Sequence, residues 1–125
     1  MKQIFAPEAP GAIGPYCHAV VHGDMAFCSG QIPLDPGTMM IVGTTIEEQT
    51  AQVMKNIEAV LTQVGTTLNK IIKTTIFLDS MDDFAGMNKI YEDCLKGHKP
   101  ARSTVEVGRL PKDALIEIEC IAVIE

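Results

Sequence analysis

The sequence predicts a two-layer α+β domain, in which two helices cover one face of a mixed β-sheet. Three observations indicate this fold: two segments place apolar residues at helical spacing, several others are rich in β-branched residues, and together they give the order β-β-α-β-α-β-β. The 125 residues fit a single domain, 1–125, and 46% of them are hydrophobic, which is enough for a packed core. The sheet face that the helices leave open then needs another cover, and association with further copies of the chain is the simplest source.

The first half of the chain is predicted to hold two strands and a helix. The two strands are expected on either side of a turn at 22–24. Thr45 and Glu48 then match a capping box, apolar residues follow at helical spacing, and Gly65 stands where a helix-ending glycine is expected. Residues 69–80 predict the strongest strand, because they are rich in β-branched side chains and contain no Gly or Pro.

The second half is predicted to hold the other helix and a closing hairpin. Ser80 and Asp83 repeat the capping pattern, and the helix that follows them is expected to end near Gly97. The C-terminal segment is predicted to form two strands joined by a tight turn, in which Pro111 and Lys112 are the two loop residues.

Two carboxylates stand in the last strand, which is otherwise apolar. Because side chains alternate along a strand, Glu117 and Glu119 share one face, and the other face is wholly apolar. The predicted hairpin would pair Glu106 with Glu117 and Thr104 with Glu119. That register puts Arg102 on the same face as the carboxylates, and a slip of one residue would undo it.

Two interpretations of this face stay open. On either interpretation Arg109 or Lys73 can help to neutralise the carboxylates. The face can be a solvated edge with surface ion pairs. It can also be an anion-binding cleft, in which Arg102 grips a small carboxylate through two parallel N–H bonds. A partly buried Glu beside that anion would have a raised pKa and could activate a water molecule.

Three further residues have both a chemical and a structural interpretation. Tyr16 can be an aromatic wall or a proton donor, or it can be ordinary packing with a bonded hydroxyl. Gly30 in SGQIP can let backbone N–H groups approach a ligand, or it can mark a bulge. Asn88 can contact a ligand, but an asparagine at such a helix position more often faces solvent.

Other reactive residue types form no recognisable pattern. His18, His22 and His98 lack the spacing of metal ligands, so no metal site is expected. Ser29 and Ser103 have no evident triad partners. The four cysteines are far apart and form no C-x-x-C pair, so they are expected to be free thiols, mostly buried.

Composition argues against several classes of partner. The formal net charge is −6, and no cluster of basic residues exceeds two, so neither nucleic acid nor an anionic membrane is expected as a partner. No apolar run reaches the length of a signal peptide or a membrane span. A cytoplasmic protein is therefore expected.

Five segments together resemble the Rid family, that is, RidA/YjgF-type proteins. They span nearly the whole chain: AIGPY (12–16), SGQIP (29–33), QTAQVMKNIEAVL (49–61), KTTIFLDSMDDFAGMNKIYED (73–93) and PARSTVEVGRLPKDALIEIECIAV (100–123). The resemblance implies a chorismate-mutase-like fold and a homotrimer with a central barrel and clefts between subunits. It also implies a 2-iminobutanoate/2-iminopropanoate deaminase, which hydrolyses reactive imines and enamines to 2-oxo acids and ammonia without a cofactor.

The resemblance also implies roles for single residues. Arg102 matches the arginine that binds the substrate carboxylate, Glu117 the residue that positions the attacking water, and Tyr16 a cleft tyrosine that joins them as a catalytic residue. The substrate-binding set that it implies is Arg102, Ser29, Gly30, Thr104 and Asn88. Glu119 is then left as a structural partner, and either the twist of the sheet or a second subunit must bring Arg102 to Glu117.

Two departures from the family pattern bear on these expectations. Cys17 and His18 replace the usual Ser-Gln after GPY, which affects the rim of the cleft, and Thr104 replaces a frequent Cys, so a role for that thiol does not transfer. Two other functions remain open. One is a metabolite-sensing regulatory trimer that binds 2-oxo acids and docks on other proteins. The other is an RNA-cleaving translation inhibitor, which the acidic charge disfavours.

Overall fold

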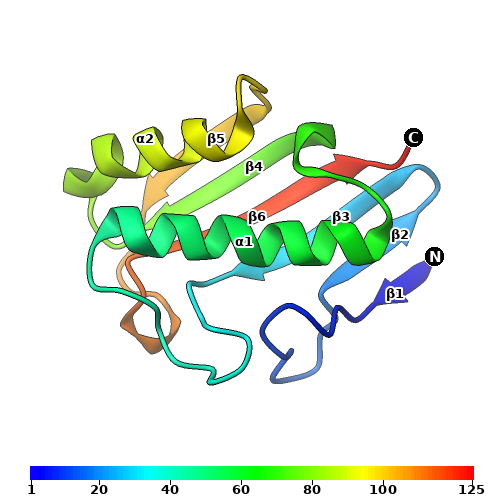
Figure 1. The fold of residues 1–125 in the computed structure, drawn as a ribbon, viewed down its shortest axis with the longest axis horizontal. Coiled ribbons are helices and arrows are strands. Elements are labelled where there is room, and N and C mark those ends of the chain that lie inside the picture. Colours follow the sequence, from blue (N-terminus) through cyan, green and yellow to red (C-terminus); the bar gives the residue numbers. More distant parts are fainter.

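The structure, a computed structural model, describes residues 1–125 and consists of a six-stranded sheet with two helices on one face (Figure 1). Its helices and strands, in chain order, are β1 (Lys2–Ile4), β2 (Ala19–His22), β3 (Met25–Gln31), α1 (Ile46–Val64), β4 (Ile71–Leu78), α2 (Phe84–Leu95), β5 (Ala101–Glu106) and β6 (Ile116–Val123). The predicted two-layer α+β class with a mixed sheet is confirmed. No helix is long and apolar enough to cross a membrane.

The strand order across the sheet is β1-β2-β3-β6-β4-β5. Neighbouring strands are antiparallel except β4 and β5, which are parallel because α2 carries the chain back across the sheet between them. The predicted order of elements therefore lacked one strand, the three-residue β1 at the edge. Its few residues carry too little alternation to be recognised in the sequence.

The predicted C-terminal hairpin is wrong, because β4 lies between β5 and β6. The connection from β5 to β6 contains a 3-10 turn, Pro111–Asp113, in which Lys112 and Asp113 have left-handed φ values of 56° and 57°. It is a crossing loop and not a two-residue turn. The register that paired Glu106 with Glu117 is therefore also wrong; Glu106 instead accepts a hydrogen bond of 2.8 Å from the backbone N–H of Met81.

The predicted helix ends are mostly confirmed. Thr45 and Glu48 form a complete capping box at the start of α1, and Gly65 ends that helix in the left-handed conformation with φ 99°. Ser80 accepts a bond from the Asp82 N–H, but it caps a short 3-10 turn that precedes α2. Helix α2 ends at Leu95, next to the predicted Gly97; Lys96 caps it in the left-handed conformation, and Gly97 also has a positive φ of 94°.

The core lies between the helices and the sheet. Fifteen buried residues form its main cluster, drawn from α1, α2, β4 and β6, and the apolar face of β6 is fully buried in it as predicted. A second cluster of five packs the N-terminal segment against β2 and α1. The opposite sheet face has no helix on it, and it exposes Phe27 by 45% and Val105 by 43%.

Candidate functional site

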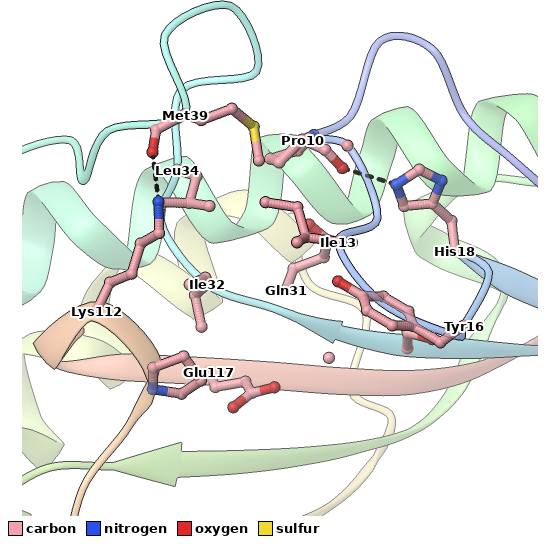
Figure 2. A pocket seen from close by; sticks show the side chains of 14 residues that line it. Pro10, Ile13, Tyr16, His18, Gln31, Ile32, Leu34, Met39, Lys112 and Glu117 are labelled. Carbon is pink, nitrogen blue, oxygen red and sulfur yellow. Dashed lines mark hydrogen bonds between the residues drawn. The ribbon is translucent and has the colours of Figure 1, made fainter.

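Glu117 of β6 lies on the open face of the sheet and lines a cavity of about 580 Å³. Figure 2 shows its carboxylate and the ring of Tyr16 in the same cavity, with Lys112 on the other side. Burial raises the pKa of the Glu117 carboxyl, and the nearby charge of Glu119 raises it further. A carboxylate with this environment is a candidate general base in a cavity of the size that binds small molecules.

Gly30 allows the Glu117 carboxylate to approach the backbone of β3. The pairing of β3 with β6 is regular up to Cys28 and is interrupted by a bulge before Gln31, so Gly30 lies in the bulge. A Cβ at Gly30 would collide with the Glu117 carboxylate, whose Cδ would be only 2.9 Å away. The interpretation of this glycine as a bulge is therefore confirmed; Gly30 also lines the cavity, and the approach of a ligand to its backbone stays a prediction.

Tyr16 belongs to the irregular N-terminal segment, which forms one wall of the cavity. This segment is fixed by His18, a buried residue immediately before β2. The Ala6 N–H donates to His18 Nδ1 at 2.8 Å, so His18 Nε2 carries the proton and donates to the Pro10 carbonyl at 2.7 Å (Figure 2). Tyr16 itself is half-exposed, at 49%, and can act as an aromatic wall.

Helix α1 holds the opposite wall of the cavity through a buried amide. Asn56 is 1% exposed, and its Nδ2 donates to the carbonyls of Ile32 at 3.1 Å and Leu34 at 3.0 Å. Gln52 donates to Asn56 Oδ1 at 3.0 Å and so fixes the orientation of the amide. The loop after β3 therefore keeps a defined shape although it contains no regular structure.

Arg102 of β5 lies on the helix-covered face. Its guanidinium carbon is 5.5 Å from the ring centre of Phe84 and 5.3 Å from that of Tyr91, and Nη1 donates to Asn88 Oδ1 at 2.7 Å. A second cavity, of about 310 Å³, is lined by Arg102 and Asn88. The guanidinium is thus held rigidly by α2, while most of its N–H groups have no protein acceptor and can bind an anion.

The structure does not bring Arg102 and Glu117 together. Thr74 of β4 is paired with Arg102 on one side and with the buried Cys120 on the other, so these three residues form one row across the sheet. Glu117 is paired with Phe77, three residues further along β4, and lies in a different row. Residues in one row point to one face, so Arg102 and Glu117 point to opposite faces. The prediction of a shared face was wrong because it depended on the hairpin register, and the twist of the sheet cannot correct it.

The remaining predicted site residues lie on both faces of the sheet. Ser29 lines the Glu117 cavity, but its hydroxyl already donates to the Cys17 carbonyl at 2.7 Å. The Thr104 hydroxyl lies on the Arg102 side of the sheet and is buried without a hydrogen-bond partner. Asn88 does not simply face solvent: its side-chain oxygen accepts the hydrogen bond from Arg102 and so orients the guanidinium.

The cations suggested for the carboxylate face do not neutralise it within the chain. Arg109 forms an exposed ion pair with Asp113 at 2.9 Å, and Lys73 donates to the Ser103 hydroxyl at 3.3 Å. Glu119 is exposed and forms no ion pair in the chain. No three His, Cys, Asp or Glu side chains lie close enough together to hold a metal ion.

Sequence reasoning missed three residues that shape the Glu117 cavity. His18 and Asn56 are polar residues at buried positions, and each bonds to two backbone groups of the cavity wall. In the sequence, Asn56 stands next to the apolar residues that form the buried side of α1, and this position could have indicated a buried amide. Lys112, which donates to the Met39 carbonyl at 3.0 Å, had been assigned to a hairpin turn.

Comparison with known proteins gives matches over nearly the whole chain. The family described as Endoribonuclease L-PSP matches residues 6–124. A RutC family protein of Pyrococcus horikoshii is 52% identical over 123 residues, which cover 98% of both chains. The solved structure of YyfA of Yersinia pestis, described as of the Rid protein family, is 52% identical with a TM-score of 0.95 and 98% coverage of both chains. TdcF of E. coli, solved with bound serine, is 41% identical with a TM-score of 0.95 over the full length of both chains.

Proposed function

The chain belongs to the Rid family, also described as RutC or endoribonuclease L-PSP proteins, and from this premise we propose that it is a deaminase of reactive 2-imino acids. Its substrates would be 2-iminopropanoate and 2-iminobutanoate, together with the enamines from which they form. The products are 2-oxo acids and ammonia. The observation that carries the proposal is a half-buried carboxylate, Glu117, whose raised pKa and fixed position against Gly30 suit a base that activates water.

Arg102 is the proposed anchor for the substrate carboxylate. Its guanidinium is stacked between two aromatic rings and bonded to Asn88, so little conformational entropy remains to be lost on binding. A bidentate pair with the carboxylate fixes the direction in which the imine carbon points. The amino acid bound in the TdcF structure carries the same carboxylate next to a nitrogen-bearing carbon, which supports this substrate class.

Glu117 is the proposed base. Ionised Glu117 takes a proton from water while the water oxygen attacks the imine carbon, and Glu117 then passes that proton to the imine nitrogen to give a carbinolamine. In the next step Glu117 transfers the hydroxyl proton to the amino group, the C–N bond breaks, ammonia leaves and the 2-oxo group forms, which leaves Glu117 ionised again. The imine carbon beside the carboxylate is already electrophilic, so only a modest rate enhancement is needed. Orientation of the substrate by Arg102 and proton transfer by Glu117 can supply it.

The complete site is proposed to form between subunits of a homotrimer. Each chain carries the Arg102 half on its helix-covered face and the Glu117 half on its open face. Three observations support association: the open face exposes Phe27 and Val105, β5 is an edge strand paired only with β4, and no helix covers this side. A neighbour that covers the open face can place its Arg102 near Glu117.

The test is turnover of freshly generated imine. An amino acid oxidase produces 2-iminobutanoate in the presence of semicarbazide, and the deaminase lowers the yield of the imine adduct by hydrolysing the imine first. We expect the wild-type protein to suppress the adduct, and the Arg109→Ala variant, altered at an exposed ion pair, to match it. Binding of a 2-oxo acid without suppression of the adduct would contradict the deaminase and favour a metabolite-sensing trimer.

The family description also names an endoribonuclease, but this chain lacks the charge expected for RNA binding. The net charge is −6, and the cavity of Glu117 has one Lys, Lys112, and no Arg in its lining. We therefore do not propose RNA cleavage. Absence of RNA binding at low ionic strength, where phosphate contacts are strongest, is the expected result.

A further inference from the structure

Cys28 of β3 and Cys120 of β6 face each other directly across two antiparallel strands. Both are free thiols, and both point toward the helices, since Cys28 shares its row with the buried Ala19 as well as with Cys120. Neither takes part in the proposed deaminase mechanism. The other two cysteines, Cys17 and Cys94, have no cysteine opposite them in the sheet.

The separation of the two strands suits a bond between these thiols. Residues directly opposite each other in an antiparallel pair have Cα atoms about 4.5–5.5 Å apart. A disulfide spans Cα atoms about 4.4–6.8 Å apart. Closure of a Cys28–Cys120 disulfide therefore needs side-chain rotation and only small adjustment of the backbone.

The two thiols differ in environment. Cys120 is 3% exposed and lies in the main core, while Cys28 is partly accessible to solvent. A hydrogen bond from the Cys120 thiol lowers the pKa of Cys28, while that interaction and burial both raise the pKa of Cys120. Cys28 is thus the more reactive thiol and the one that a small oxidant can reach, and Cys120 is the thiol placed to react with it next.

The backbone next to the pair is irregular, which eases the adjustment. Cys28–Cys120 is the last regular pair before the bulge that contains Gly30. Strands bend and twist more readily at a bulge than along a continuous ladder. The same bulge places Gly30 against Glu117 on the other face of the sheet, so the cysteine pair adjoins the proposed catalytic carboxylate.

We propose that Cys28 and Cys120 are a peroxide-reactive thiol pair that closes to a cross-strand disulfide. The Cys28 thiolate attacks the terminal oxygen of a hydroperoxide; the O–O bond breaks, the alcohol or water leaves with a proton, and Cys28 becomes a sulfenic acid. The Cys120 sulfur then attacks the Cys28 sulfur, the S–S bond forms, and the hydroxyl leaves as water with the Cys120 proton. Two thiols lose two electrons in total, and one hydroperoxide gains them.

The test treats the folded protein with limited hydrogen peroxide and counts the remaining thiols after denaturation. We expect the four free thiols of the untreated chain to fall to two, the mass to fall by about two hydrogens, and digestion to yield a linked peptide that contains Cys28 and Cys120. A thiol reductant should restore all four. Loss of thiols without this linked peptide, or linkage of different cysteines, would overturn the proposal.

Variants separate the two roles. Cys120→Ala should leave Cys28 as a sulfenic acid that a dimedone probe traps, whereas Cys28→Ala should abolish both the disulfide and the trapped adduct. Cys94→Ser is the matched control, because Cys94 is also a half-buried thiol but lies on α2, and burial raises its pKa. Labelling of Cys94 before Cys28 in the wild-type protein would contradict the assignment, and this readout needs no variant to fold.

Discussion

The guanidinium of Arg102 and the carboxylate of Glu117 extend from opposite faces of one sheet. Arg102 packs under α2 in the row of Cys120, while Glu117 lines the cavity on the open face. A 2-imino acid carries its carboxylate directly beside the imine carbon, so an anchor and a base must reach adjacent atoms of one small molecule. A single chain cannot supply both groups to one ligand, so the proposed site needs a second copy to supply one of them.

Removing the charge of Arg102 should remove the anchor while keeping most of its packing. Arg102→Met retains an apolar stem between Phe84 and Tyr91, so the fold should persist. Without the charged bonds to the substrate carboxylate, kcat/KM in the semicarbazide assay should fall by about 10²–10³-fold. Arg102→Met with wild-type kcat/KM would show that the carboxylate binds elsewhere.

Glu117→Gln should lower kcat by about 10²–10⁴-fold, the usual contribution of a general base, with a smaller effect on ligand binding. Glu117 must be ionised to act as a base, and burial and Glu119 raise its pKa. As the pH is lowered, wild-type activity should therefore begin to fall at a higher pH than it would with a glutamate of ordinary pKa. The pH profile of kcat checks this. If Glu117→Gln instead weakened ligand binding and kept the wild-type kcat, Glu117 would be a binding group and not the base.

The same raised pKa has a stability consequence of known sign. The folded protein holds the proton of Glu117 more tightly than the unfolded chain does. Protonated Glu117 therefore favours the folded state at low pH, and this contribution to the free energy of unfolding is lost as the pH rises through the pKa of the folded state. Glu117→Gln, which is always neutral, should therefore gain thermal stability relative to wild type at neutral pH and lose that gain in acid. Equal differences in Tm at both pH values would contradict the shift.

Gly30→Ala tests the close approach of β3 to the proposed catalytic carboxylate of Glu117. The new methyl group collides with Glu117, so either the carboxylate or the bulge must move, at a cost of about 1–3 kcal/mol in the free energy of unfolding. The deaminase activity should fall because Glu117 is displaced. Gly108→Ala is the control: it has no atom within 4 Å of the added Cβ and should change neither quantity.

His18→Ala should loosen the wall that carries Tyr16. It leaves the Ala6 N–H and the Pro10 carbonyl without their partner, which costs about 1–3 kcal/mol of stability. Since Arg102 and Glu117 are untouched, KM should rise more than kcat falls. His22→Ala, at an exposed position of β2, is the matched control. An equal change in stability and KM in both variants would contradict the role of His18 in fixing this wall.

Local patterns predicted local structure well. The capping box of Thr45 and Glu48, the glycine at the end of α1 and the alternation along β6 each depend on neighbouring residues, and each is confirmed. That alternation placed Glu117 and Glu119 on one face but did not distinguish them; the structure shows Glu117 partly buried and Glu119 exposed. Gly30 was predicted to mark a bulge or to let a ligand approach the backbone; the structure shows the bulge and the Glu117 carboxylate close beside Gly30, and the approach of a ligand stays a prediction.

Strand pairing over longer distance was not predictable in the same way. The segment Ile71–Glu106 has the order strand, helix, strand, which favours parallel pairing of β4 with β5, but the tight-turn interpretation of Pro111 gave β5 the wrong neighbour. One wrong partner moved Arg102 to the wrong face of the sheet. Side chains such as His18, whose partners are backbone groups of an irregular loop, have no periodic signal at all.

Activity of mixed oligomers tests most directly the claim that each site is built from two chains. Arg102→Met and Glu117→Gln, each inactive alone, are refolded together in equal amounts and assayed with 2-iminobutanoate. In a randomly mixed oligomer, a site between neighbours is intact when one chain supplies Glu117 and the next supplies Arg102, so roughly a quarter of wild-type activity should return. Mixed oligomers, verified by mass spectrometry, that remain inactive would contradict a site shared between subunits.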